Sequence, residues 1–303
     1  MSKWRRYLYL VVDHLQGTYY PLRRIESSNL FFPATQKITT NATVEARLPP
    51  PYMSFAPSDF RDTIGTLNFF TMFGRGATKR LIAGADESGF TFMYDVGQRT
   101  VHVSDLRLNS PKQDETVSLA VGDALYVMDK CPRPESNNNR CGFEALVFDF
   151  EEPEYMAAGL AGLALALPPA AAILGKWMLP FHGRADYIPE YNLWLGFSAE
   201  NDSTLCALDL NAAKPVVRSV MEEEGTQESE ELMLNDSYLV NLGAGKFCVA
   251  RFFQREYTLT AEKGYESHIC TEVERFVVLT GFVAAGLSGP CGKLRMRKHK
   301  SRR

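Results

Sequence analysis

Short apolar runs, separated by polar turns, recur along this chain. The clearest pair lies at residues 193–197 and 204–210, and polar residues 200–203 join the two runs. Runs of this length, bounded by turn residues, are typical of neighbouring antiparallel strands. Neither run alternates cleanly between apolar and polar positions, which is typical of strands that are covered on both faces. The pattern predicts an all-β protein built from repeated units of this kind.

Four sets of runs follow the same plan. The first set places four short strands within residues 66–104, which is the strand content of one propeller blade. The other sets are the runs at 116–121, 124–129 and 143–150, then the pair above with an outer strand at 216–220, then the runs at 237–242, 245–253, 275–282 and 293–297. Their spacing is looser than a kelch repeat of about 50 residues, so a barrel or a sandwich stays open as an alternative to a propeller.

Three of the apolar runs end in aspartate, at Asp95, Asp129 and Asp209. An aspartate at the end of a strand commonly accepts hydrogen bonds from the backbone of the next turn. We therefore expect these residues to cap strands or close turns rather than to take part in catalysis.

The N-terminal part of the chain has a different character. Residues 7–12 and 18–24 predict a hairpin that turns at 13–17, and residues 26–62 form a polar, proline-bearing connecting arm. This change of composition predicts two parts. Residues 1–62 are the hairpin and arm, and residues 63–303 are a propeller-like repeat domain.

Residues 156–174 interrupt the strand pattern with nineteen uncharged residues. Their length alone would suit a membrane helix. Pro168 and Pro169 lie in the middle of the segment and argue against one, because proline breaks a helix interior. We expect a short helix that ends before Pro168.

The net charge and the cysteine content limit which partners and which cellular compartment we expect. The net charge is −3, which argues against broad electrostatic binding to nucleic acid or to an anionic membrane. Six cysteines are present without a CxxC pair, and Cys206 and Cys248 lie in apolar runs, where a buried free thiol is expected. The N-terminal residues 1–12 are basic and then apolar, as in a weak signal peptide, but the apolar run is short and Asp13 and His14 follow it without a small-residue cleavage site, so we expect no secretory signal. A soluble protein of a reduced compartment, cytoplasmic or nuclear, is therefore predicted.

Motifs for catalysis, cofactors or metals are not recognised. Residues 243–246, Gly-Ala-Gly-Lys, resemble the end of a phosphate loop, but Val240 stands where the loop needs its first glycine and Phe247 stands where it needs Ser or Thr. A glycine-containing β-turn is expected there instead. No two of the five histidines have metal-ligand spacing. We expect no catalytic residue, cofactor or metal, and no enzymatic activity.

Two polar segments remain as candidates for interaction. His182, Arg184 and Asp186 form the densest polar cluster, which would suit acid–base chemistry or, as we prefer, a loop held by hydrogen bonds to the backbone. The basic residues of 293–303 would suit a nuclear-import signal or a nucleic-acid patch, but their alternation with Leu294 and Met296 favours an edge strand and tail.

Several phrases together resemble a known family. They lie at residues 7–14, 124–129, 143–146, 179–190, 245–253 and 294–300. In these phrases the chain resembles a grass-expanded family of plant proteins known as domain of unknown function 1668 and regarded as kelch-like. The resemblance covers nearly the whole chain and implies a β-propeller. It implies no activity, ligand or catalytic residue.

Two departures from the family pattern matter for the fold. Relatives carry a further set of strands between the segments that correspond to 167–169 and 177–181, whereas only residues 170–176 lie between them here. Relatives also continue beyond the Lys-His-Lys segment at 298–300. We therefore expect a propeller shortened by about one blade, and a closed ring that loses a blade exposes strand edges.

These observations predict a non-enzymatic, monomeric β-propeller scaffold that recognises a protein partner of unknown identity, with neither nucleic acid nor membrane as its ligand. One alternative is a small-molecule binder or enzyme that uses a central propeller pocket containing residues 182–186. A nuclear protein with a basic tail and a non-functional truncated remnant are the others.

Overall fold

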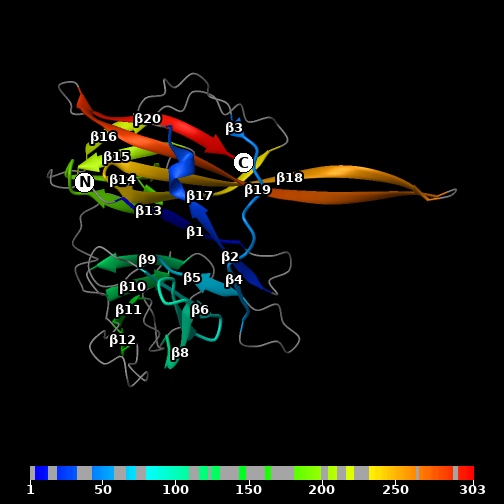
Figure 1. Cartoon of the computed structure of the whole chain (residues 1–303), viewed down its shortest axis with the longest axis horizontal. Helices are drawn as coiled ribbons and strands as arrows, with labels where there is room; N and C mark the ends of the chain where they lie inside the picture. Colours follow the sequence, from blue (N-terminus) through cyan, green and yellow to red (C-terminus); the bar gives the residue numbers. More distant parts are fainter. Residues whose placement is uncertain are drawn as a thin grey trace, which may run out of the picture. The chain divides into compact units, whose positions relative to one another are not determined.

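The computed structural model shows that the chain is built almost entirely of β-strands (Figure 1). It describes residues 4–12, 19–32, 43–57, 66–72, 80–108, 116–121, 124–129, 143–147, 161–164, 181–198, 204–209, 216–221, 232–263, 266–288 and 293–303. Regular structure within these residues consists of β-strands and the short 3-10 helix η1 (Ser27–Leu30). The all-β class predicted from the apolar runs is confirmed.

The chain divides into two compact units. The first comprises Met1–Leu8, Arg24–Pro49 and Met178–Arg303, and the second comprises Tyr9–Arg23 and Pro50–Trp177. Each unit therefore combines segments that are distant in the sequence. The predicted division between residues 62 and 63 stays a prediction.

The second unit contains two four-stranded antiparallel sheets. One has the order β5-β6-β7-β8, and the other has the order β12-β11-β10-β9. Their strands are β5 (Leu67–Phe69), β6 (Leu81–Asp86), β7 (Phe90–Asp95), β8 (Thr100–Arg107), β9 (Thr116–Val121), β10 (Ala124–Asp129), β11 (Phe143–Val147) and β12 (Ala161–Ala164). Leu81 and Met93 of the first sheet share one core with Leu125 and Leu146 of the second. Small antiparallel sheets packed through a shared core are the building plan of propeller blades.

A three-stranded sheet has the order β1-β2-β4, with β1 (Tyr7–Val11), β2 (Tyr20–Glu26) and β4 (Met53–Phe55). The division into two units passes through β1 and β2. The predicted N-terminal hairpin is confirmed by the pairing of β1 with β2. Within the second unit, the Tyr20 hydroxyl accepts a hydrogen bond from the Leu67 amide at 3.1 Å, and Phe55 packs against Phe69 and Phe92.

The first unit repeats the plan with two further sheets. One has the order β13-β14-β15-β16, and the other has the order β17-β18-β19-β20-β3, in which β3 alone pairs in parallel. Their strands are β13 (Phe181–Ile188), β14 (Leu193–Ser198), β15 (Leu205–Asp209), β16 (Val216–Met221), β17 (Met233–Gly243), β18 (Lys246–Lys263), β19 (Glu266–Ser288), β20 (Lys293–Arg302) and β3 (Thr43–Val44). Leu195 and Leu205 of the first sheet share a core with Phe247 and Phe282 of the second.

Two aspartate side chains close tight turns in the second unit. The Asp86 Oδ1 atom accepts hydrogen bonds from the Ser88 and Phe90 amides, both at 2.9 Å, where β6 turns into β7. Asp95 Oδ1 accepts from the Gly97 and Gln98 amides at 2.7 and 3.0 Å. The turn-closing role predicted for Asp95 is confirmed.

Several local expectations need correction. Residues 161–164, where a short helix was expected, form β12, because pairing with β11 overrides the helix preference of Ala and Leu. Residues 182–186, expected as a loop, lie in β13, where the pairing with β14 shifts register between His182 and Ala185. The connecting arm contains η1, β3 and β4. Residues 222–231 are rich in glutamate, which predicts a solvated loop, and they lie outside the described residues.

Other details agree with the sequence. Gly243, Ala244 and Gly245 all have positive φ and make the tight turn between β17 and β18 that was expected instead of a phosphate loop. Cys206 and Cys248 are free and buried. Burial raises the pKa of the Cys206 thiol to about 11 and that of the Cys248 thiol to about 12, so both stay protonated.

In the described part of the chain, no helix has the length and apolar character that crossing a membrane requires. Residues 161–164 are the only described part of the uncharged segment at 156–174, and they form a strand. The number of blades and the expected loss of one stay predictions.

Candidate binding site

The β18–β19 hairpin extends well beyond the rest of its sheet (Figure 1). The two strands are 18 and 23 residues long. Strand β17 pairs with β18 only as far as Gln254, and β20 pairs with β19 only from Leu279 onward. We call residues 255–263 and 266–278 the outer hairpin. Its two strands pair only with each other within the described residues, and no other described strand covers the outer backbone edge of either one.

Cross-strand side-chain pairs support the outer hairpin. Arg255 lies opposite Glu274, and its guanidinium nitrogen Nη2 donates to Glu274 Oε2 at 2.6 Å. Tyr257 lies opposite Glu272, and its hydroxyl donates to Glu272 Oε2 at 2.9 Å. Such pairs contribute roughly 0.2–1 kcal/mol each. Since a two-stranded ribbon is marginally stable on its own, these contacts keep the hairpin extended without burying it.

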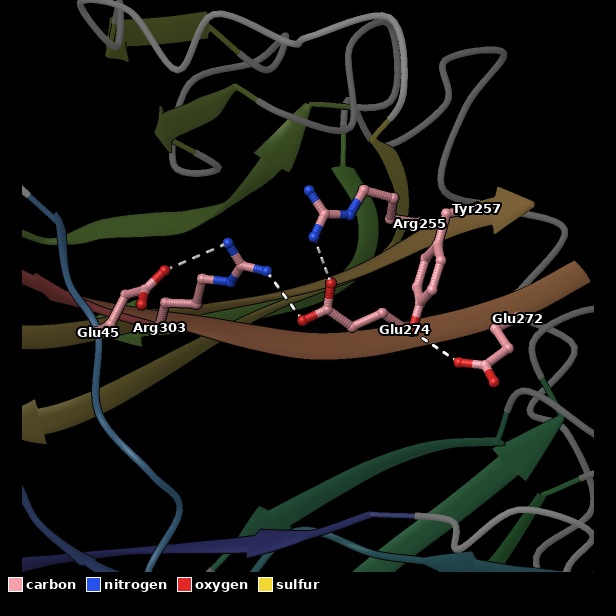
Figure 2. A network of polar contacts seen from close by, with 6 residues as sticks. All are labelled: Glu45, Arg255, Tyr257, Glu272, Glu274 and Arg303. Atoms are coloured by element: carbon pink, nitrogen blue, oxygen red, sulfur yellow. Dashed lines mark hydrogen bonds and ion pairs between the residues drawn. The ribbon is translucent and has the colours of Figure 1, made fainter. Parts of the chain in front are cut away.

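Glu274 also links the hairpin to the end of β20. Its Oε1 atom accepts a hydrogen bond from Arg303 Nη2 at 3.1 Å, while Arg303 Nη1 lies 3.6 Å from Glu45 Oε1 (Figure 2). The Arg303 guanidinium also lies 3.8 Å from the centre of the Phe276 ring. The hydrogen bond from Arg255 and the charge of Arg303 lower the pKa of Glu274, so the carboxylate stays ionised near neutral pH.

Backbone pairing fixes the segment after β3 beside β20. Ser301 and Arg302 pair in parallel with Thr43 and Val44. The Ala46 amide then donates to the Arg303 carbonyl at 2.8 Å. This pairing brings residues near position 45 next to the end of β20, although more than 250 positions separate them in the sequence.

A pocket of about 330 Å³ lies beside this junction, within the first unit. We call it the arginine pocket. Four arginines and one glutamate line it together with apolar residues: Arg24, Arg47, Arg302, Arg303, Glu26, Ile25, Ala46, Leu48, Pro49, Val277 and Leu279, with Asn29 of η1 completing the lining. Its volume is at the lower end of the range for small-ligand sites.

The charges around the arginine pocket do not cancel. Glu26 is paired with Arg6, which lies outside the lining, at 3.2 Å. Arg303 is paired with Glu274 and Glu45. Among the described residues, Arg47 and Arg302 form no side-chain ion pair. Positive charge therefore remains beside an apolar surface, and guanidinium groups bind carboxylate and phosphate oxygens well.

A second cluster holds the N-terminal segment against β20. The His299 Nδ1 atom accepts a hydrogen bond from the Phe32 amide at 3.3 Å, and the His299 ring lies 5.4 Å from the Phe31 ring. Lys246 lies 3.8 Å from the centre of the Trp4 ring. Burial, together with the nearby cations of Arg297, Lys246 and Lys300, lowers the pKa of His299, so its ring is neutral at pH 7.

The cluster predicted from the sequence lies elsewhere. His182, Arg184 and Asp186 are on β13 and do not line the arginine pocket. Asp186 is buried, with 9% of its surface exposed, while the side chains of His182 and Arg184 lie outside the described residues. The assignment of these three as interaction residues stays a prediction.

Sequence reasoning found only part of the arginine pocket. It placed residues 293–297 in a basic edge strand and left Arg302 and Arg303 in a tail. Strand β20 (Lys293–Arg302) confirms the strand, but it runs on through the expected tail to Arg302 and is not at the edge of its sheet, because β3 pairs with its last two residues. The sequence gave no reason to connect Arg302 and Arg303 with Arg24 or Arg47, because the two-residue strand β3 that joins the segments is too short to leave a hydrophobic pattern. Among the described residues, no group of three or more His, Cys, Asp or Glu side chains is placed to hold a metal ion.

Comparison with known proteins adds a family but no activity. No curated protein matches the chain. Among solved structures, the dihydro-haem d1 dehydrogenase NirN in complex with DHE is similar at 9% identity, with 97% of this chain and 73% of that chain covered and a TM-score of 0.28. That score is too low to support an argument about fold or function.

The family comparison is far more extensive. Residues 5–170 and 172–303 match the family described as Protein of unknown function (DUF1668). The match covers almost every described residue of both compact units. The chain therefore belongs to this family.

Proposed function

We propose that this chain is a non-enzymatic protein-recognition module whose partner binds along the outer hairpin. The observation that carries the proposal is that the outer backbone edges of residues 255–263 and 266–278 pair with no other strand that the structure describes. An unpaired strand edge presents a row of amide and carbonyl groups that a partner strand completes by β-augmentation.

The side chains near the hairpin support the same proposal. Tyr257 is 39% exposed and Val273 is 40% exposed. On the adjoining edge strand β17, Tyr238 is 53% exposed and Met233 is 63% exposed. Tyrosine and methionine are enriched at protein interfaces, and a partner strand would cover apolar surface that now faces solvent.

The chemistry of the arginine pocket favours binding over catalysis. Its described lining holds guanidinium, carboxylate, amide and apolar groups, and its single carboxylate, that of Glu26, is already paired with Arg6 at 3.2 Å. The kelch-like character implied by the family resemblance belongs to the same proposal, since loops and edges of propellers commonly serve recognition.

Site-specific photo-crosslinking tests the proposal. A benzophenone amino acid is placed at Thr258, which is exposed on the outer hairpin, and in a control chain at Val101, which is 47% exposed on β8 of the second unit. Both chains are irradiated in extract of the native tissue. We expect a discrete adduct from position 258 and none of the same mass from position 101. Equal adducts from both positions, or none from either, would contradict the proposal.

A further inference from the structure

We propose that the arginine pocket binds the carboxylates of an acidic peptide segment. This inference deepens the recognition function proposed above and rests on it for the identity of the ligand as a protein segment. The pocket lies where β2, η1, the segment after β3, β19 and β20 meet, and it shares only Val277 with the outer hairpin.

Charge selects the ligand class. Of the five ionisable residues in the lining, Arg24, Arg47, Arg302 and Arg303 are cations and Glu26 is the single anion. Glu26 and Arg303 already have partners, whereas Arg47 and Arg302 have no ion-pair partner among the described residues. A guanidinium group donates two parallel hydrogen bonds to a carboxylate, so these two residues suit anionic side chains.

The apolar half of the lining distinguishes a peptide from a free anion. Val277 and Leu279 on β19 face the same space as Leu48 and Pro49. Val277 and Leu279 are buried, with 5% and 6% of their surface exposed, so Leu48, which is 40% exposed, supplies most of the apolar surface that a ligand would cover. A bare phosphate gains nothing from such surface, while a segment that alternates acidic and apolar residues gains from both halves.

The position of the pocket fits a partner that already contacts the outer hairpin. Glu274 joins Arg255 of the hairpin to Arg303 of the lining (Figure 2). A partner strand added along the edge of β19 would end where β20 begins to pair, at Leu279, and its end would lie beside Arg302 and Arg303 of the lining. The pocket would then select the partner by charge, and the edge would supply backbone hydrogen bonds.

The test uses the full chain and a defined probe. The probe is a fluorescein-labelled, capped peptide of sequence Glu-Leu-Glu-Leu-Glu, and the matched probe is Gln-Leu-Gln-Leu-Gln. Binding is followed by fluorescence anisotropy. We expect the acidic peptide to bind at least tenfold more tightly than the neutral one, a difference of about 1.4 kcal/mol. Because the contacts are partly exposed charges, we also expect its affinity to fall as salt rises from 50 to 200 mM.

Single substitutions assign the binding to the pocket. Arg302→Gln and Arg47→Gln should each weaken binding of the acidic peptide about tenfold. Arg275→Gln is the matched control, because Arg275 is exposed on β19 two residues before Val277 but does not line the pocket. It should change binding less than twofold. Circular dichroism melts confirm that each variant folds.

Three results would overturn the inference: equal binding of the two peptides, an effect of Arg275→Gln as large as that of Arg302→Gln, or complete displacement of the peptide by inorganic phosphate at a lower concentration than unlabelled peptide requires. The last result would identify the pocket as a phosphate site. Failure here, with the crosslink at position 258 retained, leaves the hairpin proposal intact. Loss of the crosslink, with Arg302-dependent peptide binding retained, removes the hairpin proposal alone.

Discussion

Two sheets of this protein follow the same plan but end differently. The sheet β5–β8 of the second unit turns from β6 to β7 after six residues, and Asp86 closes that turn. In the sheet β17–β20 of the first unit, β18 and β19 run on as an outer hairpin beyond their neighbours. All six residues of β6 are buried, whereas residues 256–258 and 271–273 are exposed. The buried residues of β6 belong to a strand that the core requires. The exposed residues of the outer hairpin belong to a part of β18 and β19 that the core does not require, and we assign this part to binding.

The inner part of β19 should behave like core, and this gives the largest expected effect. A Cβ atom at Gly281 would overlap the backbone carbonyl of Leu30 in η1. Gly281→Ala should lower the free energy of unfolding by about 3 kcal/mol, because backbone cannot move aside as a side chain can. Urea unfolding measures the change. Gly97→Ala is the control, since its nearest neighbour is the Asp95 carboxylate at 3.1 Å, and an equal loss in both variants would contradict the reasoning.

The short-turn sheet should depend on its aspartates. The Asp95 side chain is 4% exposed, and it also pairs with Arg80 at 3.0 Å. Asp95→Ala should cost about 2 kcal/mol, because two backbone amides and a guanidinium lose a charged acceptor. Asp95→Asn keeps the Oδ1 acceptor and should cost less than about 1 kcal/mol. Thermal or urea unfolding that ranks the two variants equally would show that the turn does not need the side-chain oxygen.

The His299 cluster should make the stability of the folded chain depend on pH, because His299 is partly buried on β20. The pKa of His299 is lowered in the folded chain by burial and by the cations of Arg297, Lys246 and Lys300, so the unfolded chain binds the proton more readily. Its contribution to stability is complete above the ordinary histidine pKa of about 6.5 and is lost as pH falls through the lowered value.

Urea unfolding of the wild-type chain and of His299→Asn, from pH 8 to pH 5, measures this contribution. We expect the stability difference between the two chains to shrink as pH falls. A difference that is constant with pH would mean that His299 titrates alike in the folded and unfolded chains.

The outer hairpin should contribute little to stability. Replacing residues 257–272 with Asn-Gly keeps the Arg255–Glu274 pair and joins the flanking strands by a two-residue turn. Tyr257, Thr258, Thr271 and Glu272 are exposed, so we expect the free energy of unfolding to change by less than about 1 kcal/mol. A loss of several kcal/mol in urea unfolding would place the hairpin in the stabilising core and remove the distinction drawn above.

The sequence predicts those parts of the fold that depend on patterns among neighbouring residues. The apolar runs of β14 and β15 and the glycine turn after Gly243 are local patterns, and the structure confirms them. Strand β12 was missed because Ala and Gly favour no strand until β11 pairs with them. Strand β13 was missed because polar residues interrupt its apolar pattern where its pairing with β14 shifts register, between His182 and Ala185.

The candidate site was harder to predict, for a physical reason. Residues 255–258 and 271–275 are mixed in polarity, so they carry no strand period, and pairing across the hairpin alone defines them. The arginine pocket depends on parallel pairing between β3 and β20, which joins distant segments through only two residues. Contacts of this range leave no trace in one sequence.

The central claim is that the outer hairpin serves binding rather than folding. Competition in the crosslinking experiment tests it most directly: unlabelled intact chain or unlabelled trimmed chain, with residues 257–272 replaced, is added in excess to chain labelled at position 258. We predict that the intact chain abolishes the adduct and the trimmed chain leaves it unchanged. Equal competition by the two chains would contradict the claim, because the partner would then bind without the hairpin.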